Sequence, residues 1–175
     1  EIAVPPTFFN EYENRPRAMA LQDMTISETM NTRDLKLEEM PWLNEQQRAI
    51  WNEHYGPRNE EFRNADLEGQ AKDLWRYQRY IKDYLRCIKG VDENVGRLLN
   101  YLDDSGLSEN TLVIYCSDQG FFLGEHGWFD KRWAYEESLH TPFVARWPGV
   151  IEPGSVNDDL VSVIDFAATF CDVAE

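Results

Sequence analysis

The hydrophobic pattern is strongest in the middle of the chain. Between residues 70 and 103, apolar side chains recur at spacings of three and four, which is the period of an amphipathic helix. The positions are Leu74, Tyr77, Ile81, Tyr84, Leu85, Ile88, Val91, Val95, Leu98, Leu99 and Leu102. Gly90 lies inside this pattern and could weaken the helix, since glycine costs about 1 kcal/mol relative to alanine. Ser105 and Gly106 are expected to end the helix.

Residues 1–69 show weaker periodicity than the segment that follows. Asn44 is expected to be a helix N-cap with Gln47 three residues on, close to a capping box, and the helix should end before Gly56-Pro57. Residues 1–43 are rich in Pro, Asn, Asp and Glu. One short helix is expected at 17–26, and the rest of this stretch is interpreted as a long surface excursion. We therefore expect an irregular and helical excursion over 1–69 and a core over 70–175.

Two short strands and a last helix are predicted in the final third. The nearly continuous apolar run Thr111–Cys116 is typical of a strand buried on both faces, as in a parallel sheet covered by helices. A second strand is expected over Phe143–Trp147, and Asp165 should cap a final helix. That helix is expected to bury Phe166, Phe170 and Val173. The order of helix, strand, loop, strand and helix predicts an α/β fold.

Composition narrows the range of partners. The chain has 32 acidic and 17 basic residues, and its formal charge of −15 disfavours nucleic acid and anionic lipid as partners. An anionic substrate would need a cation and a few basic groups to invert the field locally. No apolar run approaches the roughly 20 residues that span a bilayer. Cys87, Cys116 and Cys171 each lie in an apolar pattern and are expected to be buried free thiols.

Asp118 and Gln119 directly follow the first predicted strand. Ligands of open α/β sheets gather at the carboxyl ends of strands. A carboxylate and an amide carbonyl are hard oxygen donors that suit Ca²⁺ or Mg²⁺. Gly120 would let the backbone turn tightly so that both side chains converge. The alternative is an ordinary turn from a strand into a loop.

A longer string around this pair resembles a known family. It runs from Thr111 to Lys131 (TLVIYCSDQGFFLGEHGWFDK) and continues through YEES at 135–138 and PFVARWPG at 142–149. Further matching segments are DENVGRLL at 92–99 and VIDFAATF at 163–170. This sequence closely resembles the type I, formylglycine-dependent sulfatases over residues 70–175. The resemblance implies an alkaline-phosphatase-like α/β/α sandwich, present here as a partial domain. It is closest to bacterial-type enzymes of the N-acetylglucosamine-6-sulfatase and iduronate-2-sulfatase kind, which act on glycosaminoglycans.

The resemblance also implies roles for individual residues. Asp118 and Gln119 resemble two ligands of a single Ca²⁺, although the family most often has Asn in the second position. Lys131 matches a lysine that contacts the sulfate group, where its charge would stabilise the transition state. The alternative for Lys131 is a solvated surface lysine between Asp130 and Arg132.

His126 and the aromatic residues beside it have two interpretations each. His126 could contact substrate or donate a proton, because its ordinary pKa lies near neutrality, or it could order the loop. Trp128 and Phe129 could line a sugar subsite, although aromatic residues in a glycine-rich loop more often anchor it. His54, at a helix end, and His140, before the second strand, are interpreted as structural. Glu136 and Glu137 are expected to begin a helix rather than to act as an acid and a base.

The nucleophile motif of the family, Cys/Ser-x-Pro-x-Arg, does not occur in the 175 residues. The resemblance implies that the formylglycine and the remaining metal ligands lie outside this chain, which starts after the family's central histidine motif and stops before its C-terminal subdomain. We therefore expect residues 1–175 alone to be inactive. Export to the periplasm, cell surface or exterior is likewise implied by the resemblance. The alternatives are a phosphatase or phosphodiesterase of the same superfamily, and a non-catalytic binding module with a degenerate sulfatase fold.

Overall fold

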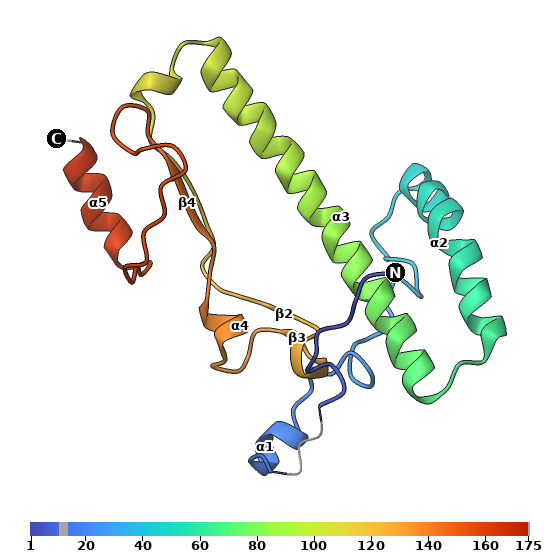
Figure 1. Cartoon of the computed structure of the whole chain (residues 1–175). Helices are drawn as coiled ribbons and strands as arrows, with labels where there is room; N and C mark the ends of the chain where they lie inside the picture. Colours follow the sequence, from blue (N-terminus) through green and yellow to red (C-terminus); the bar gives the residue numbers. More distant parts are fainter. Residues whose placement is uncertain (11–13, 175) are drawn as a thin grey trace.

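The computed structural model describes residues 1–10 and 14–174. One long helix, α3, runs diagonally through the molecule, with α2 beside its N-terminal half and the longer strands and the last helix on its other side (Figure 1). The elements are α1 (Arg17–Ala20), α2 (Glu45–Ala65), α3 (Gly69–Asp104), β1 (Val113–Cys116), β2 (Phe122–Leu123), β3 (Phe129–Asp130), α4 (Glu136–Leu139), β4 (Phe143–Arg146) and α5 (Asp165–Ala174), with 3₁₀ turns at Ser108–Asn110 and Glu125–Gly127.

Helix α2 begins as predicted but ends later. Asn44 accepts a hydrogen bond from the backbone of Gln47, whose side chain accepts one from the backbone of Asn44, so the capping box is complete. The expected end before Gly56-Pro57 is wrong, because the helix continues to Ala65 with Pro57 inside it. Contacts beyond the proline hold this extension: the ring of Phe62 stacks on Trp75 of α3 at 3.7 Å between centroids. Tertiary packing therefore overrides a local helix breaker.

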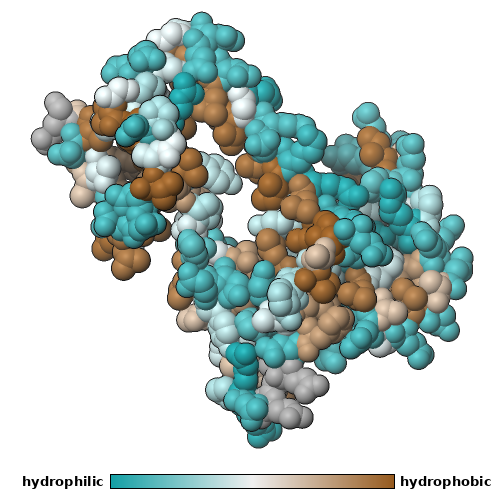
Figure 2. Space-filling model, in the orientation of Figure 1, coloured by the Kyte–Doolittle hydropathy of each residue, from teal (hydrophilic) through white to brown (hydrophobic). Residues whose placement is uncertain are grey.

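Helix α3 confirms the predicted periodic segment and continues without a break through Gly90. Its N-terminal half buries Tyr77 and Ile81. Its C-terminal half leaves much of the apolar stripe exposed, at Leu85, Ile88, Val91, Leu98 and Tyr101. Brown, apolar surface is accordingly visible along α3 and around β4 and α5 in Figure 2.

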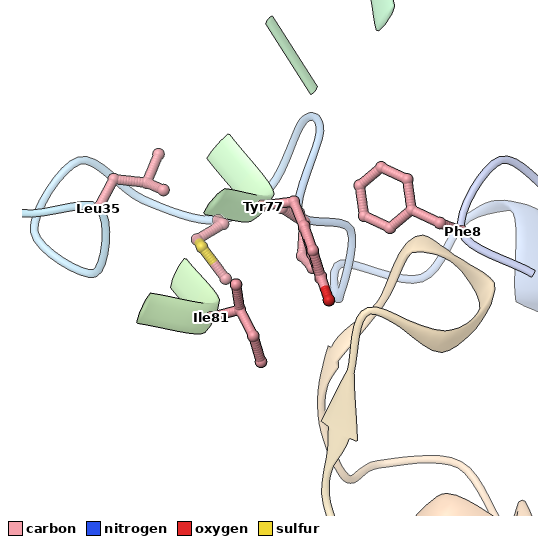
Figure 3. Packing of buried hydrophobic residues seen from close by; sticks show 6 residues of the cluster. Phe8, Leu35, Tyr77 and Ile81 are labelled. Atoms are coloured by element: carbon pink, nitrogen blue, oxygen red, sulfur yellow. The ribbon is translucent and has the colours of Figure 1, made fainter. Parts of the chain in front are cut away.

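Residues 1–43 do not form the surface excursion that their composition suggested. Phe8, Ile26, Met30 and Leu35 are buried with Tyr77 and Ile81 in one cluster. Figure 3 shows Phe8 beside Tyr77, and the two ring centroids lie 5.0 Å apart. The expected helix at 17–26 is limited to Arg17–Ala20. Weak periodicity hid this core, because its apolar side chains come from turns rather than from a regular element.

Arg76 fastens the segment Met24–Met30 to α3. Its Nε donates to the carbonyl of Ile26 at 2.5 Å, and its Nη2 donates to the carbonyl of Met30 at 2.6 Å. The same segment also pairs with the glycine-rich loop of residues 120–131, through a β-bridge between Thr25 and Trp128. One guanidinium thereby holds a turn segment between a helix and a loop.

The glycine-rich loop contains a small antiparallel hairpin that the sequence did not predict. Strands β2 and β3 pair with Phe122 opposite Asp130. Trp128 is fully buried in a second cluster with Met19, Met24 and Phe122. The hairpin is therefore anchored by its own aromatic residues and by the N-terminal segment.

Strands β1 and β4 lie where they were predicted, but their pairing differs. They are antiparallel, with Val113 opposite Arg146 and Cys116 opposite Phe143. Tyr115 and Cys116 are exposed, so the prediction of burial on both faces is wrong within the described residues. The predicted burial of the three cysteines is also wrong within the described residues, because Cys87, Cys116 and Cys171 are all exposed.

The last helix confirms the predicted start at Asp165 but not the predicted burial. Phe166 is half-buried and contacts Phe143 at 5.5 Å between centroids. Phe170 and Val173 are exposed. Among the described helices, none is both long and apolar enough to cross a membrane.

A backbone hydrogen bond of Gly120 joins the turn after β1 to α4. Its N–H donates to the carbonyl of Ser138 at 2.8 Å, and a Cβ at this position would lie 2.1 Å from the carbonyl oxygen of Glu137. Its φ is not positive, so the expected reason for a glycine here, a tight turn, is wrong. Close approach of two backbones is the reason, and α4 begins at Glu136 as predicted.

Replacement of Arg76 by methionine should destabilise the natural full-length protein by about 2–3 kcal/mol, because two carbonyls lose charged donors. Denaturant unfolding measures the change. Arg97→Met on the exposed surface of the same helix is the control, since Arg97 donates to the side chain of Asn94, three residues before it on α3. Equal effects of the two substitutions would contradict the role of Arg76.

Replacement of Gly120 by alanine should cost about 2–3 kcal/mol, because backbone atoms of Glu137 must move. Gly90→Ala is the matched control: nothing lies within 4 Å of its added Cβ, and it should be neutral or stabilising by up to about 1 kcal/mol. Thermal unfolding of both variants gives the comparison. An unchanged melting temperature for Gly120→Ala would show that α4 does not dock closely on this turn.

Candidate active site

The turn after β1 presents Asp118 to solvent. Asp118 is exposed, Gln119 is half-buried and Gly120 is buried. The hydroxyl of Ser117 donates to the carbonyl of Gln119 at 2.8 Å, which holds the turn locally. The backbone contact of Gly120 with α4 fixes its far end. A carboxylate and an amide thus sit side by side on a turn held at both ends.

The hairpin brings Lys131 back toward this turn. Phe122 pairs with Asp130, so Phe121 and Lys131 are the next residues beyond the pair. The Nζ of Lys131 lies 5.8 Å from the centre of the Phe121 ring and 3.9 Å from Oδ1 of Asp130. Since Gln119 is two residues before Phe121, chain connectivity keeps their Cα atoms within about 7 Å. Gln119 and Lys131, which are 12 positions apart in the sequence, therefore lie near the same end of the hairpin.

Lys131 borders a cavity of about 390 Å³ with aromatic walls. The rings of Tyr84 and Phe121 stack at 5.9 Å and 25°. The hydroxyl of Tyr80 donates to the carbonyl of Phe122 at 2.8 Å, which ties the hairpin to α3, and burial raises the pKa of Tyr80 above its ordinary value. The lining residues are Met30, Asp34, Lys36, Tyr80, Asp83, Tyr84, Cys87, Phe121, Phe129, Asp130 and Lys131.

Most members of this cavity were not predicted from the sequence, among them Tyr84 and Lys36. Tyr84 was read as part of the apolar stripe of α3, and its place beside Phe121 has no local signal. Lys36 adds a second ammonium group to the lining. It lies 95 residues before Lys131, so only the folded N-terminal segment brings it here. A cation and aromatic faces in one cavity suit a sugar that carries an anionic group.

His126 lies at the opposite end of the hairpin, in the turn between its strands. It has a φ of 57°, and its N–H donates to Oγ1 of Thr7 at 3.0 Å. Its Nδ1 lies 3.1 Å from Nδ2 of Asn10. Burial lowers the pKa of His126, although Glu137 opposes the shift. These contacts favour the interpretation that His126 orders the loop. His126 lies in the turn of the hairpin and Lys131 follows its second strand, and a catalytic role of His126 stays a prediction.

The other candidates have structural surroundings. Trp128 has no exposed surface, which favours the anchoring interpretation over a sugar subsite, whereas Phe129 lines the Lys131 cavity. His54 lies inside α2, not at its end as expected, because the helix continues past Pro57. His140 pairs with Glu136 at 3.2 Å on the exposed end of α4.

Metal-binding chemistry at the site rests on two donors. In the part of the chain that the structure describes, no group of three or more His, Cys, Asp or Glu residues could hold a metal ion. Asp118 and Gln119 are both hard oxygen donors, which fits Ca²⁺, but Ca²⁺ takes about six to eight oxygen ligands. The pair therefore fits a minority of such a coordination shell.

Comparison with known proteins identifies the family. The sulfatase family model matches residues 5–175. An N-acetylglucosamine-6-O-sulfatase of Bacteroides thetaiotaomicron strain VPI-5482 is 44% identical over 97% of this chain and 33% of its own length. The extracellular sulfatase SULF-1 homolog of Drosophila melanogaster is 36% identical over 51% of this chain and 8% of its own length. The chain thus spans about a third of the length of the bacterial relative.

A solved structure supports the same conclusion for the fold. The structure of BT4656 in complex with its substrate D-glucosamine-2-N,6-O-disulfate covers 99% of this chain with a TM-score of 0.92 and 41% identity, and 38% of that protein is matched. The predicted fold class is therefore confirmed: the chain forms part of an α/β domain of the alkaline-phosphatase-like type. The chain belongs to the sulfatase family.

Proposed function

We propose that the natural protein hydrolyses sulfate esters of glycosaminoglycan-type sugars, and that Lys131 binds the sulfate group. The observation that supports this proposal is the position of Lys131 on an aromatic cavity, next to Phe121, which follows the Asp118–Gln119 pair in the sequence of a chain of the sulfatase family. The relative named N-acetylglucosamine-6-O-sulfatase and the BT4656 complex with a disulfated glucosamine support a sulfated sugar as the substrate.

Lys131 supplies positive charge where the ester is cleaved. Its side chain is 41% exposed, so the ammonium group can reach a ligand while its nitrogen lies 5.8 Å from the centre of the Phe121 ring. Asp130 at 3.9 Å leaves the charge only partly compensated. An ammonium group held in this way neutralises a sulfate oxygen and stabilises the charge that develops as the S–O bond breaks.

Asp118 and Gln119 are proposed to hold one Ca²⁺ together with ligands outside the described residues. When bound, this ion supplies Lewis-acid polarisation of the sulfate group. Both side chains are oxygen donors on a turn fixed by Ser117 and Gly120. The side chain of Gln119 is one methylene longer than that of asparagine. Its carbonyl oxygen can therefore bind an ion that lies one methylene farther from the backbone. The formylglycine nucleophile is proposed to lie outside residues 1–175.

The sulfated carbohydrate is the proposed partner, and export from the cytoplasm is part of the proposal. The name of the Drosophila relative, an extracellular sulfatase, supports export. The phosphatase alternative has no support among these relatives, which are named sulfatases. The non-catalytic alternative is decided by the experiment on Lys131.

Replacement of Lys131 by alanine in the natural full-length protein should lower kcat/KM on a glucosamine 6-sulfate by about 10²-fold or more, as expected when a group that stabilises transition-state charge is removed. Lys36→Ala is the control, because Lys36 lines the same cavity and carries the same charge. Its loss should be about tenfold at most. Near-normal turnover by Lys131→Ala would return Lys131 to a surface role, and a wild-type protein without turnover would favour the binding module.

Addition of Ca²⁺ after chelation should raise the melting temperature of the natural full-length protein, because a ligand of the native state stabilises it by mass action. Asp118→Ala should abolish this increase and most of the turnover. Asp158→Ala, which removes an exposed carboxylate far along the chain, should leave both unchanged. An Asp118→Ala variant that still responds to Ca²⁺ like the wild type would show that Asp118 is not a ligand.

A further inference from the structure

A second cavity, of about 570 Å³, lies between α2 and the N-terminal half of α3. It is lined by Glu1, Tyr55, Arg58, Glu61, Leu67, Ala71, Leu74, Trp75, Gln78, Arg79, Lys82 and Arg86. Four of these residues are basic and two are acidic, in a chain whose formal charge is −15. The cavity therefore inverts the overall charge of the protein locally. We call it the α2–α3 cleft.

Arg79 is the buried centre of this cleft. Only 7% of its surface is exposed, and its Nη1 has no hydrogen-bond partner among the residues that the structure describes. Its guanidinium carbon lies 5.2 Å from the ring centre of Tyr55 and 4.9 Å from that of Trp75. Aromatic faces stabilise a guanidinium but accept no hydrogen bond along its N–H directions. A buried cation with an unused donor lacks an acceptor, and an anionic group would provide one.

The electrostatic surroundings agree with an anion site. Asp83 is the carboxylate that compensates Arg79 most strongly; its Oδ1 accepts a hydrogen bond from Tyr55 at 3.2 Å and one from Arg86, whereas its buried Oδ2, like Nη1 of Arg79, has no partner among the described residues. Burial lowers the pKa of His54 at the edge of this region, and Arg58 and Arg86 lower it further. Positive charge thus exceeds negative charge around the cleft even with Asp83 included.

The cleft faces a different direction from the C-terminal half of the apolar stripe of α3, whereas Leu74 of the N-terminal half lines the cleft. Lys82 and Arg86 are four residues apart and share one helix face. At about 100° per residue, Val91 and Val95 lie on the far side of the helix from them. The Lys131 cavity uses Tyr80, Tyr84 and Cys87, which are also on another face. Elements that cover the C-terminal half of the stripe would therefore leave the cleft open to solvent.

We propose that the α2–α3 cleft is a second binding site, which holds an anionic group of a sulfated saccharide away from the site of hydrolysis. Its volume suits one or two sugar units. The choice of a sulfated saccharide rests on the proposed function, whereas preference for an anion rests on Arg58, Arg79, Lys82 and Arg86 alone. The cleft would retain a long substrate through a group that is not hydrolysed.

Binding is measured by calorimetry in the natural full-length protein with Lys131→Ala, so that the ligand is not hydrolysed. The probe is a size-defined, sulfated heparin hexasaccharide, and the same saccharide without sulfate is the comparison. Lys82→Gln with Arg86→Gln should weaken binding of the sulfated probe about tenfold, because two charged contacts are removed. The desulfated probe should bind far more weakly to every variant.

A charge-matched pair on the same helix provides the control. Lys89→Gln with Arg97→Gln removes two exposed cations outside the cleft, and it should change the affinity less than about twofold. Equal losses for the two pairs would mean general attraction to basic charge and would overturn the site. Unchanged affinity for the Lys82 and Arg86 pair would overturn it as well.

Turnover by the protein with Lys131 intact separates this proposal from the proposed function. The Lys82 and Arg86 pair should raise KM for the hexasaccharide and leave kcat/KM for a glucosamine 6-sulfate unchanged. An equal loss on both substrates would assign these residues to folding or to the active site and overturn the second site. If the wild type hydrolyses neither substrate, the proposed function fails, and the calorimetric comparison still decides whether the cleft binds sulfated sugar.

Discussion

The position of the candidate active site depends on one guanidinium. Arg76 donates to the carbonyls of Ile26 and Met30, and so fixes the segment Met24–Met30 on α3. The other edge of this segment bonds to the hairpin, because the N–H of Phe129 donates to the carbonyl of Met24 at 2.9 Å. Met24 belongs to one buried cluster, and Ile26 and Met30 belong to the other. The place of Lys131, two residues after Phe129, follows from this chain of contacts.

The sequence predicted what neighbouring residues determine. The spacing along α3, the cap at Asn44 and the two β runs are local signals, and they predicted the positions of α3, β1 and β4 and the start of α2. What failed depends on distant partners. Pro57 remains helical because Phe62 stacks on Trp75. Four apolar side chains from the first 43 residues are buried because Tyr77 and Ile81 of α3 pack against them. The antiparallel pairing of β1 with β4 could not be read from the apolar composition of either strand.

The same distinction between local signals and distant partners applies to the residues of the candidate site. Asp118, Gln119 and Lys131 could be predicted because they belong to one continuous string, and the hairpin pairs Phe122 with Asp130, the neighbour of Lys131. Lys36 and Tyr84 could not be found, since each reaches the cavity from a separate element. Gly120 was noticed for the wrong reason: the structure requires a missing side chain at a backbone contact, and not an unusual φ.

An acidic protein can bind an anionic ligand where basic side chains lie close together. Helix α3 brings such side chains together in the α2–α3 cleft. One face of this helix contributes Lys82 and Arg86 to the α2–α3 cleft, and another contributes Tyr80 and Tyr84 to the Lys131 cavity. Asp83 lies between the two, since it lines the Lys131 cavity while bonding to Arg86. At physiological salt the remaining negative field is screened over about 8 Å. Repulsion by the outer surface therefore acts mainly on anions that do not reach either cavity.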